Sequence, residues 1–301
     1  MKIRPYTADM APELTAFYNR QIRTVPHCYA VTEETLAATL AGSAPEDRRR
    51  RERLYADTIC VATEGASIAG FVHAAGLLSK TGQKTDSGII RFLGYEPGKR
   101  VVGQALLQAA EETLTGHGIQ RISAFPQDHT HSFYYLSPAY LSDRLGHVQA
   151  LLGFNGYEKD SGEVFLDWPN YAPLEPELVD IPAKITLEWK QGKAALPGLT
   201  VLAHQNGEEI GTCGCISLGE VSQQEIEQDW LFVKWLGVED RLQGKGLGRY
   251  LLQRAQKEMY EVGYRHAGIS TAWKNYRAFT FYSNYGYHVV DWTYGFQRQF
   301  Q

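Results

Sequence analysis

Long apolar runs are missing from this sequence. No window approaches about 18 uninterrupted apolar residues, the length that a membrane-spanning helix requires. The first residues, MKIRPYTADMAPEL, contain no apolar stretch of the length found in signal peptides. We therefore expect no membrane partner and a cytoplasmic protein.

Cysteine is scarce. The chain has four cysteines, Cys28, Cys60, Cys213 and Cys215, and no C-x-x-C pair. This pattern predicts neither a disulfide framework nor a zinc site, which needs several converging ligands. We expect reduced thiols, as in cytosolic proteins, and no metal. Cys213 and Cys215 would point to one face of a strand, and metal or redox use of this pair is a minor alternative.

An excess of positive charge is also missing. The chain has 30 Lys and Arg residues against 34 Asp and Glu residues, which gives a net charge of −4. This balance argues against a dedicated nucleic-acid binder, so we expect no nucleic-acid partner. The basic run DRRRRER (47–53) is flanked by acidic residues and lies in a predicted helix. We interpret it as a solvated helical face or an ion-pair cluster at a hinge, with polyanion binding as the alternative.

The two halves of the chain resemble each other. GQALLQAAEETL (103–114) parallels GRYLLQRAQKEM (248–259), and both have the apolar spacing of an amphipathic helix. A second pair of similar stretches is LLGFNGY (151–157) and FYSNYGY (281–287). Similarity at a domain-sized interval predicts a duplicated module rather than a solenoid.

A proline-rich stretch, WPNYAPLEPELVDIP, divides the two halves. Prolines at this density interrupt helices and interior strands, which is typical of a linker. We predict an N-terminal domain at 1–170, a linker at 171–182 and a C-terminal domain at 183–301.

Each half is predicted to form strands, a helix, a strand, a shorter helix and a final strand. In the second half, Asn206-Gly207 predicts a hairpin turn, and WLFVKWLGV (230–238) predicts a central strand. The first half has additional helical stretches at 10–22 and 32–42, which the second half lacks. The fold class is therefore α/β of the α+β type, with a mixed, mostly antiparallel sheet flanked by helices in each module.

Glycines cluster where the strand at 230–238 gives way to a helix, in RLQGKGLGRYLLQRA (241–255). The first turn of a helix has unpaired N–H groups and favours an anion, and glycine lets a phosphate approach the backbone. A phosphate cradle is thus predicted, with a flexible turn without ligand as the alternative. Because Gly246 follows Lys245 and the spacing is G-x-G-x-G, neither a Walker loop nor a dinucleotide fingerprint fits.

Two blocks carry a family resemblance. QGKGLG (243–248) fits Q/R-x-x-G-x-G/A, with Val238 five residues before the Gln. WKNYRAFTFYSNYGYHVV (273–290) fits N-x-x-A-x-x-F-Y-x-x-x-G-F/Y. Together they resemble the acetyl-CoA-binding motifs of the GNAT N-acetyltransferase superfamily. The arrangement of two modules, with the chemistry in the second, is similar to that of the mycothiol synthases.

The resemblance implies acetyl-CoA as cosubstrate and direct attack of an amine on the thioester. It implies that Tyr282 protonates the departing thiolate, a contribution of about 10²–10⁴-fold in general. Asn275 would bind the pantetheine arm, which pairs along the strand at 230–238. The cofactor-binding residues implied in this way are Leu236, Val238, Gln243, Gly244, Lys245, Gly246, Leu247, Gly248, Arg249 and Asn275.

The sequence departs from the family pattern at the general base. Many members have a Glu on the central strand six residues before the motif's Val, and here that position is Phe232. Asp229, Glu220 and His204 are candidates by chemistry alone, and an ordered water is an alternative. Lys234, a charge in an apolar strand, would meet an anionic substrate or CoA, or lie on an exposed face.

The first half resembles the same module without its chemistry. Val101 stands at the position of Gly246, and Leu152 stands at the position of Tyr282. A branched side chain would obstruct a phosphate, so we expect weak acyl-CoA binding or none. Lys99 and Arg100 would keep some attraction for anions.

The predicted function is acetyl transfer from acetyl-CoA to an amine, on a small molecule, in the C-terminal half. Because that half lacks the early helices, we expect the N-terminal half to help form the acceptor cleft, with the insert HTHSFYYLSPAY (129–140) lining it. The alternatives are a non-catalytic acyl-CoA sensor, which the absent strand Glu favours, and a protein or peptide N-acetyltransferase. The oligomeric state is left open.

Overall fold

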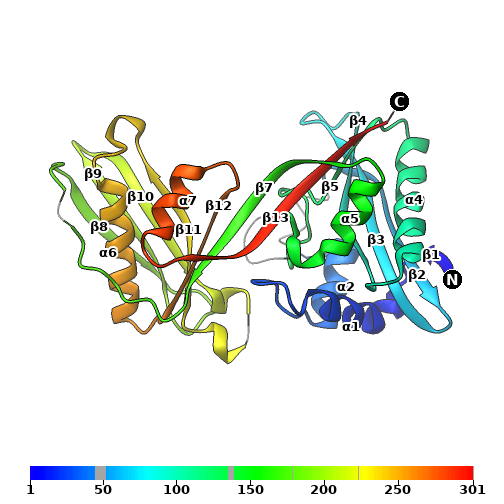
Figure 1. Cartoon of the computed structure of the whole chain (residues 1–301), viewed down its shortest axis with the longest axis horizontal. Helices are drawn as coiled ribbons and strands as arrows, with labels where there is room; N and C mark the ends of the chain where they lie inside the picture. Colours follow the sequence, from blue (N-terminus) through cyan, green and yellow to red (C-terminus); the bar gives the residue numbers. More distant parts are fainter. Residues whose placement is uncertain (45–51, 135–138, 178, 223, 301) are drawn as a thin grey trace. The chain divides into compact units, whose positions relative to one another are not determined.

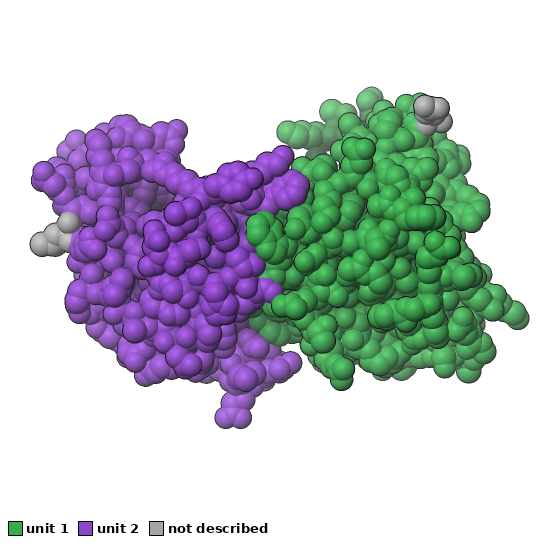
Figure 2. Space-filling model, in the orientation of Figure 1, with its two compact units in different colours: residues 1–163, 291–301 green, residues 164–290 purple. Residues whose placement is uncertain are grey.

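The computed structural model of the chain describes residues 1–44, 52–134, 139–177, 179–222 and 224–300. It has two compact units, one formed by Met1–Glu163 and Asp291–Gln301 and the other by Val164–Val290 (Figure 2). We call them unit 1 and unit 2. The divisions fall inside two long strands, β7 (Glu158–Trp168) and β13 (His288–Gln299). The division into domains at 1–170 and 183–301, joined by a linker at 171–182, remains a prediction from sequence.

Unit 1 contains a mixed, mostly antiparallel sheet with helices on both faces (Figure 1). Its strands are β1 (Lys2–Pro5), β2 (Leu54–Glu64), β3 (Ser67–Leu78), β4 (Lys84–Tyr95), β5 (Arg121–Ala124) and β6 (Leu141–Ser142). β5 runs parallel to β4, and the end of β13 pairs with β5 in the antiparallel sense. Its helices are α1 (Ala11–Ile22), α2 (Glu33–Ala41), α4 (Arg100–Gly116) and α5 (Gly146–Phe154).

The two faces of this sheet are distinguished by neighbouring residues of β3. Phe71 packs edge-to-face against Phe17 of α1, with ring centroids 6.2 Å apart. At Gly70 a Cβ atom would lie 2.8 Å from Leu106 of α4. Because successive residues of a strand face opposite sides, α1 and α4 cover opposite faces.

Unit 2 repeats the sheet with fewer helices (Figure 1). Its strands are β8 (Lys184–Lys190), β9 (Gly198–Gln205), β10 (Glu208–Ser217), β11 (Trp230–Val238) and β12 (His266–Ala272), and its helices are α6 (Leu247–Glu261) and α7 (Tyr276–Ser283). The first four strands are antiparallel neighbours, and β12 runs parallel to β11. The predicted central strand at 230–238 coincides with β11. The predicted mixed, mostly antiparallel sheet is thus confirmed.

Local sequence explains the β9–β10 hairpin. Asn206 and Gly207 have φ angles of +54° and +88°, which a two-residue turn requires and which these two residue types tolerate. In contrast, β8 and β9 are joined by residues 191–197, which form neither helix nor strand. One face of the β8–β11 sheet is packed by α6, through contacts such as Leu251 at Gly211.

The remaining elements are short 3-10 turns at Ala8–Met10, Asp143–Leu145, Leu218–Glu220, Glu225–Glu227 and Asp240–Leu242. None of the helices in the described residues combines the length and apolar character that crossing a bilayer requires. The arginine run predicted to be helical falls almost wholly at 45–51, outside the described residues. Of the insert at 129–140, residues 135–138 are likewise outside them, and Tyr134 is buried in unit 1.

Candidate active site

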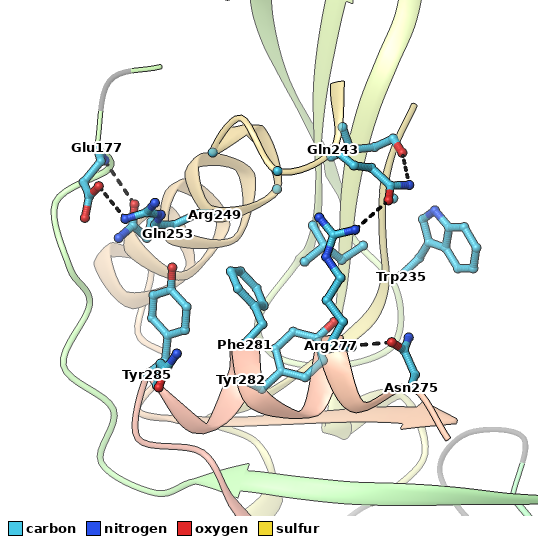
Figure 3. A pocket seen from close by; sticks show the side chains of 18 of the residues that line it. Glu177, Trp235, Gln243, Arg249, Gln253, Asn275, Arg277, Phe281, Tyr282 and Tyr285 are labelled. Carbon is cyan, nitrogen blue, oxygen red and sulfur yellow. Dashed lines mark hydrogen bonds and ion pairs between the residues drawn. The ribbon is translucent and has the colours of Figure 1, made fainter. Parts of the chain in front are cut away.

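A cavity of about 870 Å³ lies in unit 2, where the end of β11, the start of α6 and α7 meet (Figure 3). Most of the residues proposed from sequence line it: Leu236, Val238, Gln243, Gly244, Gly246, Gly248, Arg249, Asn275 and Tyr282. Two do not. The Lys245 side chain is exposed, and Leu247, the first residue of α6, is buried.

The loop before α6 depends on glycine. Gly244 and Gly246 have φ angles of +78° and +90°, in the left-handed region that other residues rarely adopt. Gly246 is the N-cap of α6 and has no side chain to bond the first turn. The N–H groups of that turn have no partner within the helix and carry the positive end of its dipole. A Cβ atom at Gly248 would extend the wall of the cavity, 3.6 Å from Val238. The loop therefore fits a phosphate group.

β11 and β12 separate at the cavity. Their described parallel pairing ends at Val233 with Ile269, whereas β10 continues to pair with β11 as far as Val238. A bulge at Gly214 and Cys215 leaves Lys234 without an opposite residue in β10. Beyond Val233, β11 is thus paired on one side, and its other edge can accept an extended ligand.

Gln243 connects the strand, the loop and α7. Its Nε2 donates to the carbonyl oxygen of Val238 at 3.1 Å and to Asp240 Oδ1 at 2.8 Å. Its Oε1 accepts a hydrogen bond from Arg277 Nη1 at 3.1 Å. Arg277 lines the cavity beside Gly244, with a guanidinium nitrogen 3.7 Å from where a Cβ atom would be. Sequence reasoning missed Arg277 because it occupies a variable position of the second motif.

α7 supplies Tyr282 and begins at Asn275. The side chain of Asn275 accepts a hydrogen bond from the Ala278 N–H at 3.2 Å, which caps the helix. Tyr282 is only 7% exposed and lines the cavity, with its ring 5.4 Å from Phe281 and 6.1 Å from Tyr287 between centroids. In Figure 3 the side chains of Phe281 and Tyr282 extend from α7, and Tyr285 follows in the turn after the helix.

The proline-rich segment lies against α6 and adds a wall that the sequence did not predict. We call residues 174–177 and 179 the strap. Glu177 Oε2 is 2.7 Å from Arg249 Nη1, and the Glu177 N–H donates to Gln253 Oε1 at 3.0 Å. Val179 lies 3.1 Å from the position that a Cβ atom would take at Gly246. The strap therefore reaches the glycine loop at Val179, and Figure 3 shows Glu177 beside Arg249 and Gln253.

Phe232 occupies the position at which many GNAT members have a Glu on the central strand, and its surroundings in the structure are apolar. Phe232 is 1% exposed and stacks on Phe165 with ring centroids 6.2 Å apart. Asp229 and His204 line neither this cavity nor a second one of about 520 Å³, which Glu220 does line. The Glu220 oxygens accept hydrogen bonds from the N–H groups of Lys193 and Ala194, at 3.3 and 3.0 Å.

In unit 1 the equivalent space is filled by side chains. At Gly103, which aligns with Gly248, a Cβ atom would lie 2.5 Å from the Tyr95 ring and 2.9 Å from Leu151. The Tyr95 hydroxyl donates to the His147 carbonyl at 2.7 Å, which fixes the ring there. The Lys99 ammonium bonds Glu96 at 2.6 Å and Glu64 at 3.0 Å. These contacts support the prediction that the first half binds acyl-CoA weakly or not at all.

The paired cysteines are buried in unit 2. Cys213 and Cys215 are both free thiols, and a hydrogen bond from the Cys215 thiol to Cys213 together with burial raises the pKa of Cys215 well above its usual value. Such a thiol is a poor nucleophile. Among the residues that the structure describes, no group of three or more His, Cys, Asp or Glu side chains is placed to hold a metal ion.

Comparisons with known proteins agree with this geometry. A family model described as an acetyltransferase (GNAT) domain matches residues 197–289. A comparison with curated proteins found no match.

Three solved structures are similar along almost the whole chain. A tandem GNAT protein from the clavulanic acid biosynthesis pathway is 13% identical, with a TM-score of 0.66 and coverage of 99% of this chain and 98% of that one. A GCN5-related N-acetyltransferase from Sphaerobacter thermophilus is 15% identical, with a TM-score of 0.61 and coverage of 99% and 95%. The glucosamine N-acetyltransferase region of a fungal multi-domain β-N-acetylglucosaminidase is 15% identical, with a TM-score of 0.64 and coverage of 99% and 38%.

Similarity at this level of identity establishes the fold, and the family model identifies the domain that contains the cavity. The chain has the tandem GNAT fold, and its second half carries an acetyltransferase domain of the GNAT superfamily.

Proposed function

We propose that the protein transfers the acetyl group of acetyl-CoA to the amine of a small molecule, in the cavity of unit 2. The observation that carries this proposal is the meeting of three features in one cavity. A glycine-capped helix start, a strand edge paired on one side and the Tyr282 side chain all line it. When bound, acetyl-CoA supplies an acetyl group activated as a thioester.

The phosphates are held by the start of α6. The N–H groups of Gly244, Gly246 and Gly248 donate to phosphate oxygens, because no side chain covers them. Arg249 and Arg277 line the same wall and add positive charge, and the exposed Lys245 adds more from outside the cavity.

The strand edge holds the extended arm of the cofactor. Leu236 and Val238 line the cavity beyond the last residue of β11 that pairs with β12. Their backbone groups form hydrogen bonds of the kind that join neighbouring strands. The Asn275 amide lies at the other side of the cavity and donates from Nδ2, since its Oδ1 caps α7.

Tyr282 is the acid. Its hydroxyl gives a proton to the departing thiolate, while the amine loses a proton as its bond to the acetyl carbon forms. The reaction therefore also needs a group that accepts the proton released by the amine. Of the three candidates, Glu220 lines a cavity, yet both its oxygens already accept backbone hydrogen bonds, so a water molecule is the acceptor that we favour.

A non-catalytic acyl-CoA sensor is the second candidate, and the buried Phe232 favours it because that position lacks a base. Tight acetyl-CoA binding with no acetylation across a broad amine panel would select the sensor. A contribution of the first half to the acceptor cleft, the small size of the acceptor and a cytoplasmic location all stay predictions.

Calorimetric titration of acetyl-CoA tests the site. We expect one binding site in the wild type and its loss in Gly248→Val, whose Cβ atom enters the cavity wall without forcing a left-handed backbone. Gly246→Val is a harsher test, because it also strains a φ of +90° and crowds Val179.

The matched control is Gly116→Val, at a glycine of unit 1 with open space around it. Undiminished binding in Gly248→Val would show that the cradle is elsewhere.

A further inference from the structure

A second cavity, of about 520 Å³, opens on the face of the unit 2 sheet that α6 does not cover. Gly211 of β10 faces α6, so Gly214, three residues further along the same strand, faces the other side. Gly214 pairs with Thr200, and Thr200 pairs with Glu188 of β8. Because Lys190 is two residues from Glu188, it shares their face and reaches the cavity.

Glycines make this hollow. A Cβ atom at Gly214 would have no heavy atom within 4 Å, and Gly198 contributes bare backbone beside it. The turn after β10 closes one end, where Glu220 binds the N–H groups of Lys193 and Ala194. The volume lies within the range of about 300–1,000 Å³ that small-molecule sites occupy.

The charges around the hollow favour an anion. Lys190 and Lys234 both line it, and within the residues that the structure describes neither ammonium group has an ion-pair or hydrogen-bond partner. The Glu220 carboxylate is the one acidic side chain among the lining residues, and two backbone N–H groups already stabilise its charge. Two unpaired cations beside an otherwise apolar hollow attract a carboxylate or a phosphate.

Trp235 connects the two cavities. It lines both of them, and its indole nitrogen lies 2.8 Å from where a Cβ atom would be at Gly237, so the ring lies along β11. Trp235 follows Lys234, the bulged residue at which β11 leaves β12. A ligand in the second hollow therefore borders the place where the acetyl group is proposed to be delivered.

We propose that this hollow is the acceptor site and that the acceptor is a small amine that also carries a carboxylate or phosphate group. The inference rests on the proposed acetyl transfer. Lys190 and Lys234 bind the anionic group, and Trp235 directs the amine toward the first cavity. In the transfer, the amine nitrogen forms a bond to the acetyl carbon, the C–S bond breaks, and the proton lost by the amine is balanced by the proton gained by the thiolate.

The test compares anionic amines with uncharged amides, which match the two acids in chain length. 4-Aminobutyrate, 6-aminohexanoate and 2-aminoethyl phosphate are titrated calorimetrically without cofactor, beside the primary amides of the two acids. Acetylation of each is then followed through release of the free CoA thiol. We expect the anionic amines to bind and react at least tenfold better than the amides, and comparison of carboxylates with the phosphate identifies the preferred anion.

Two variants and their two controls locate the effect. Lys190→Ala combined with Lys234→Ala should remove the preference for anionic amines and leave acetyl-CoA affinity unchanged. Lys184→Ala, at the far end of β8 on the same face, should change neither. Gly214→Leu should fill the hollow and lower kcat/KM for every amine at least tenfold, whereas Gly116→Leu should have no effect.

Equal binding of the amides, or a preference that survives the double Lys variant, would overturn the inference. If the amides are acetylated as well as the acids, the inference about the acceptor fails while the proposed acetyl transfer stands. If acetyl-CoA does not bind at all, the proposed function fails, and cofactor-free binding of the anionic amines still decides whether the hollow is a site.

Discussion

Arg277 and Gln243 are joined by a hydrogen bond of 3.1 Å, from Nη1 to Oε1, which ties the first turn of α7 to the glycine loop. Gln243 in turn bonds the end of β11 through the Val238 carbonyl. This pair holds a guanidinium group beside a helix N-terminus. Two sources of positive charge are thereby fixed on one wall of the cavity.

Arg277→Ala should weaken acetyl-CoA binding about tenfold, because a hydrogen bond to a charged phosphate contributes about 1.5–3 kcal/mol and part of it is replaced by water. Calorimetric titration measures the change. Arg241→Ala is the matched control, since Arg241 is an exposed arginine of the preceding turn that pairs with Glu239 and does not line the cavity. If Arg277→Ala and Arg241→Ala weaken binding equally, the loss would come from the overall positive charge near the site and not from a direct contact between Arg277 and a phosphate.

Tyr282→Phe should lower kcat about 100-fold or more and leave the acetyl-CoA dissociation constant within a factor of two, since only the hydroxyl proton is removed. Steady-state kinetics and calorimetry separate the two quantities. Tyr276→Phe, on the same helix but 71% exposed and outside the cavity lining, should have no effect on either. If turnover survives in Tyr282→Phe, another group is the acid.

Glu177→Gln should strengthen acetyl-CoA binding by a factor of about two to five, the range of a solvent-exposed ion pair. The change frees Arg249 and removes a negative charge beside the phosphates. The effect should shrink as salt is added, because both groups are exposed.

Glu175→Gln serves as the control for this change. Glu175, also in the strap, pairs with Lys257 at 2.7 Å. Lys257 lies on α6, the helix that carries Arg249, and Glu175 does not line the cavity. A loss of affinity in Glu177→Gln would mean that the strap positions Arg249 for the cofactor instead of competing for it.

Gly103→Ala and Gly248→Ala should have opposite consequences although the two glycines are equivalent in sequence. A Cβ atom at Gly103 meets the Tyr95 ring at 2.5 Å, so the alanine should cost about 1–3 kcal/mol of unfolding free energy. At Gly248 the nearest atom is 3.6 Å away, so stability should hold while acetyl-CoA affinity falls. Denaturant unfolding and calorimetry measure both; equal destabilisation would contradict the difference in packing.

Much of the site could be predicted because its motifs depend on backbone conformation. Gly244 and Gly246 adopt left-handed angles that few other residues tolerate, so local sequence carries that information. Asn275 caps a helix for a similarly local reason. Arg277, Trp235 and the strap could not be predicted, because their positions depend on contacts between segments far apart in the chain.

The sequence by itself determined the repeated order of strands and helices, the hairpin at Asn206-Gly207 and the glycine loop before α6, since each depends on periodicity or on φ angles within a few residues. Only the tertiary structure decided that the proline-rich segment meets α6 at Arg249 and that two cavities share Trp235. It also decided that in unit 1 the space beside Gly103, the equivalent of Gly248, is filled by the Tyr95 ring. These outcomes follow from side-chain packing across the sheet, where residues distant in sequence compete for the same space.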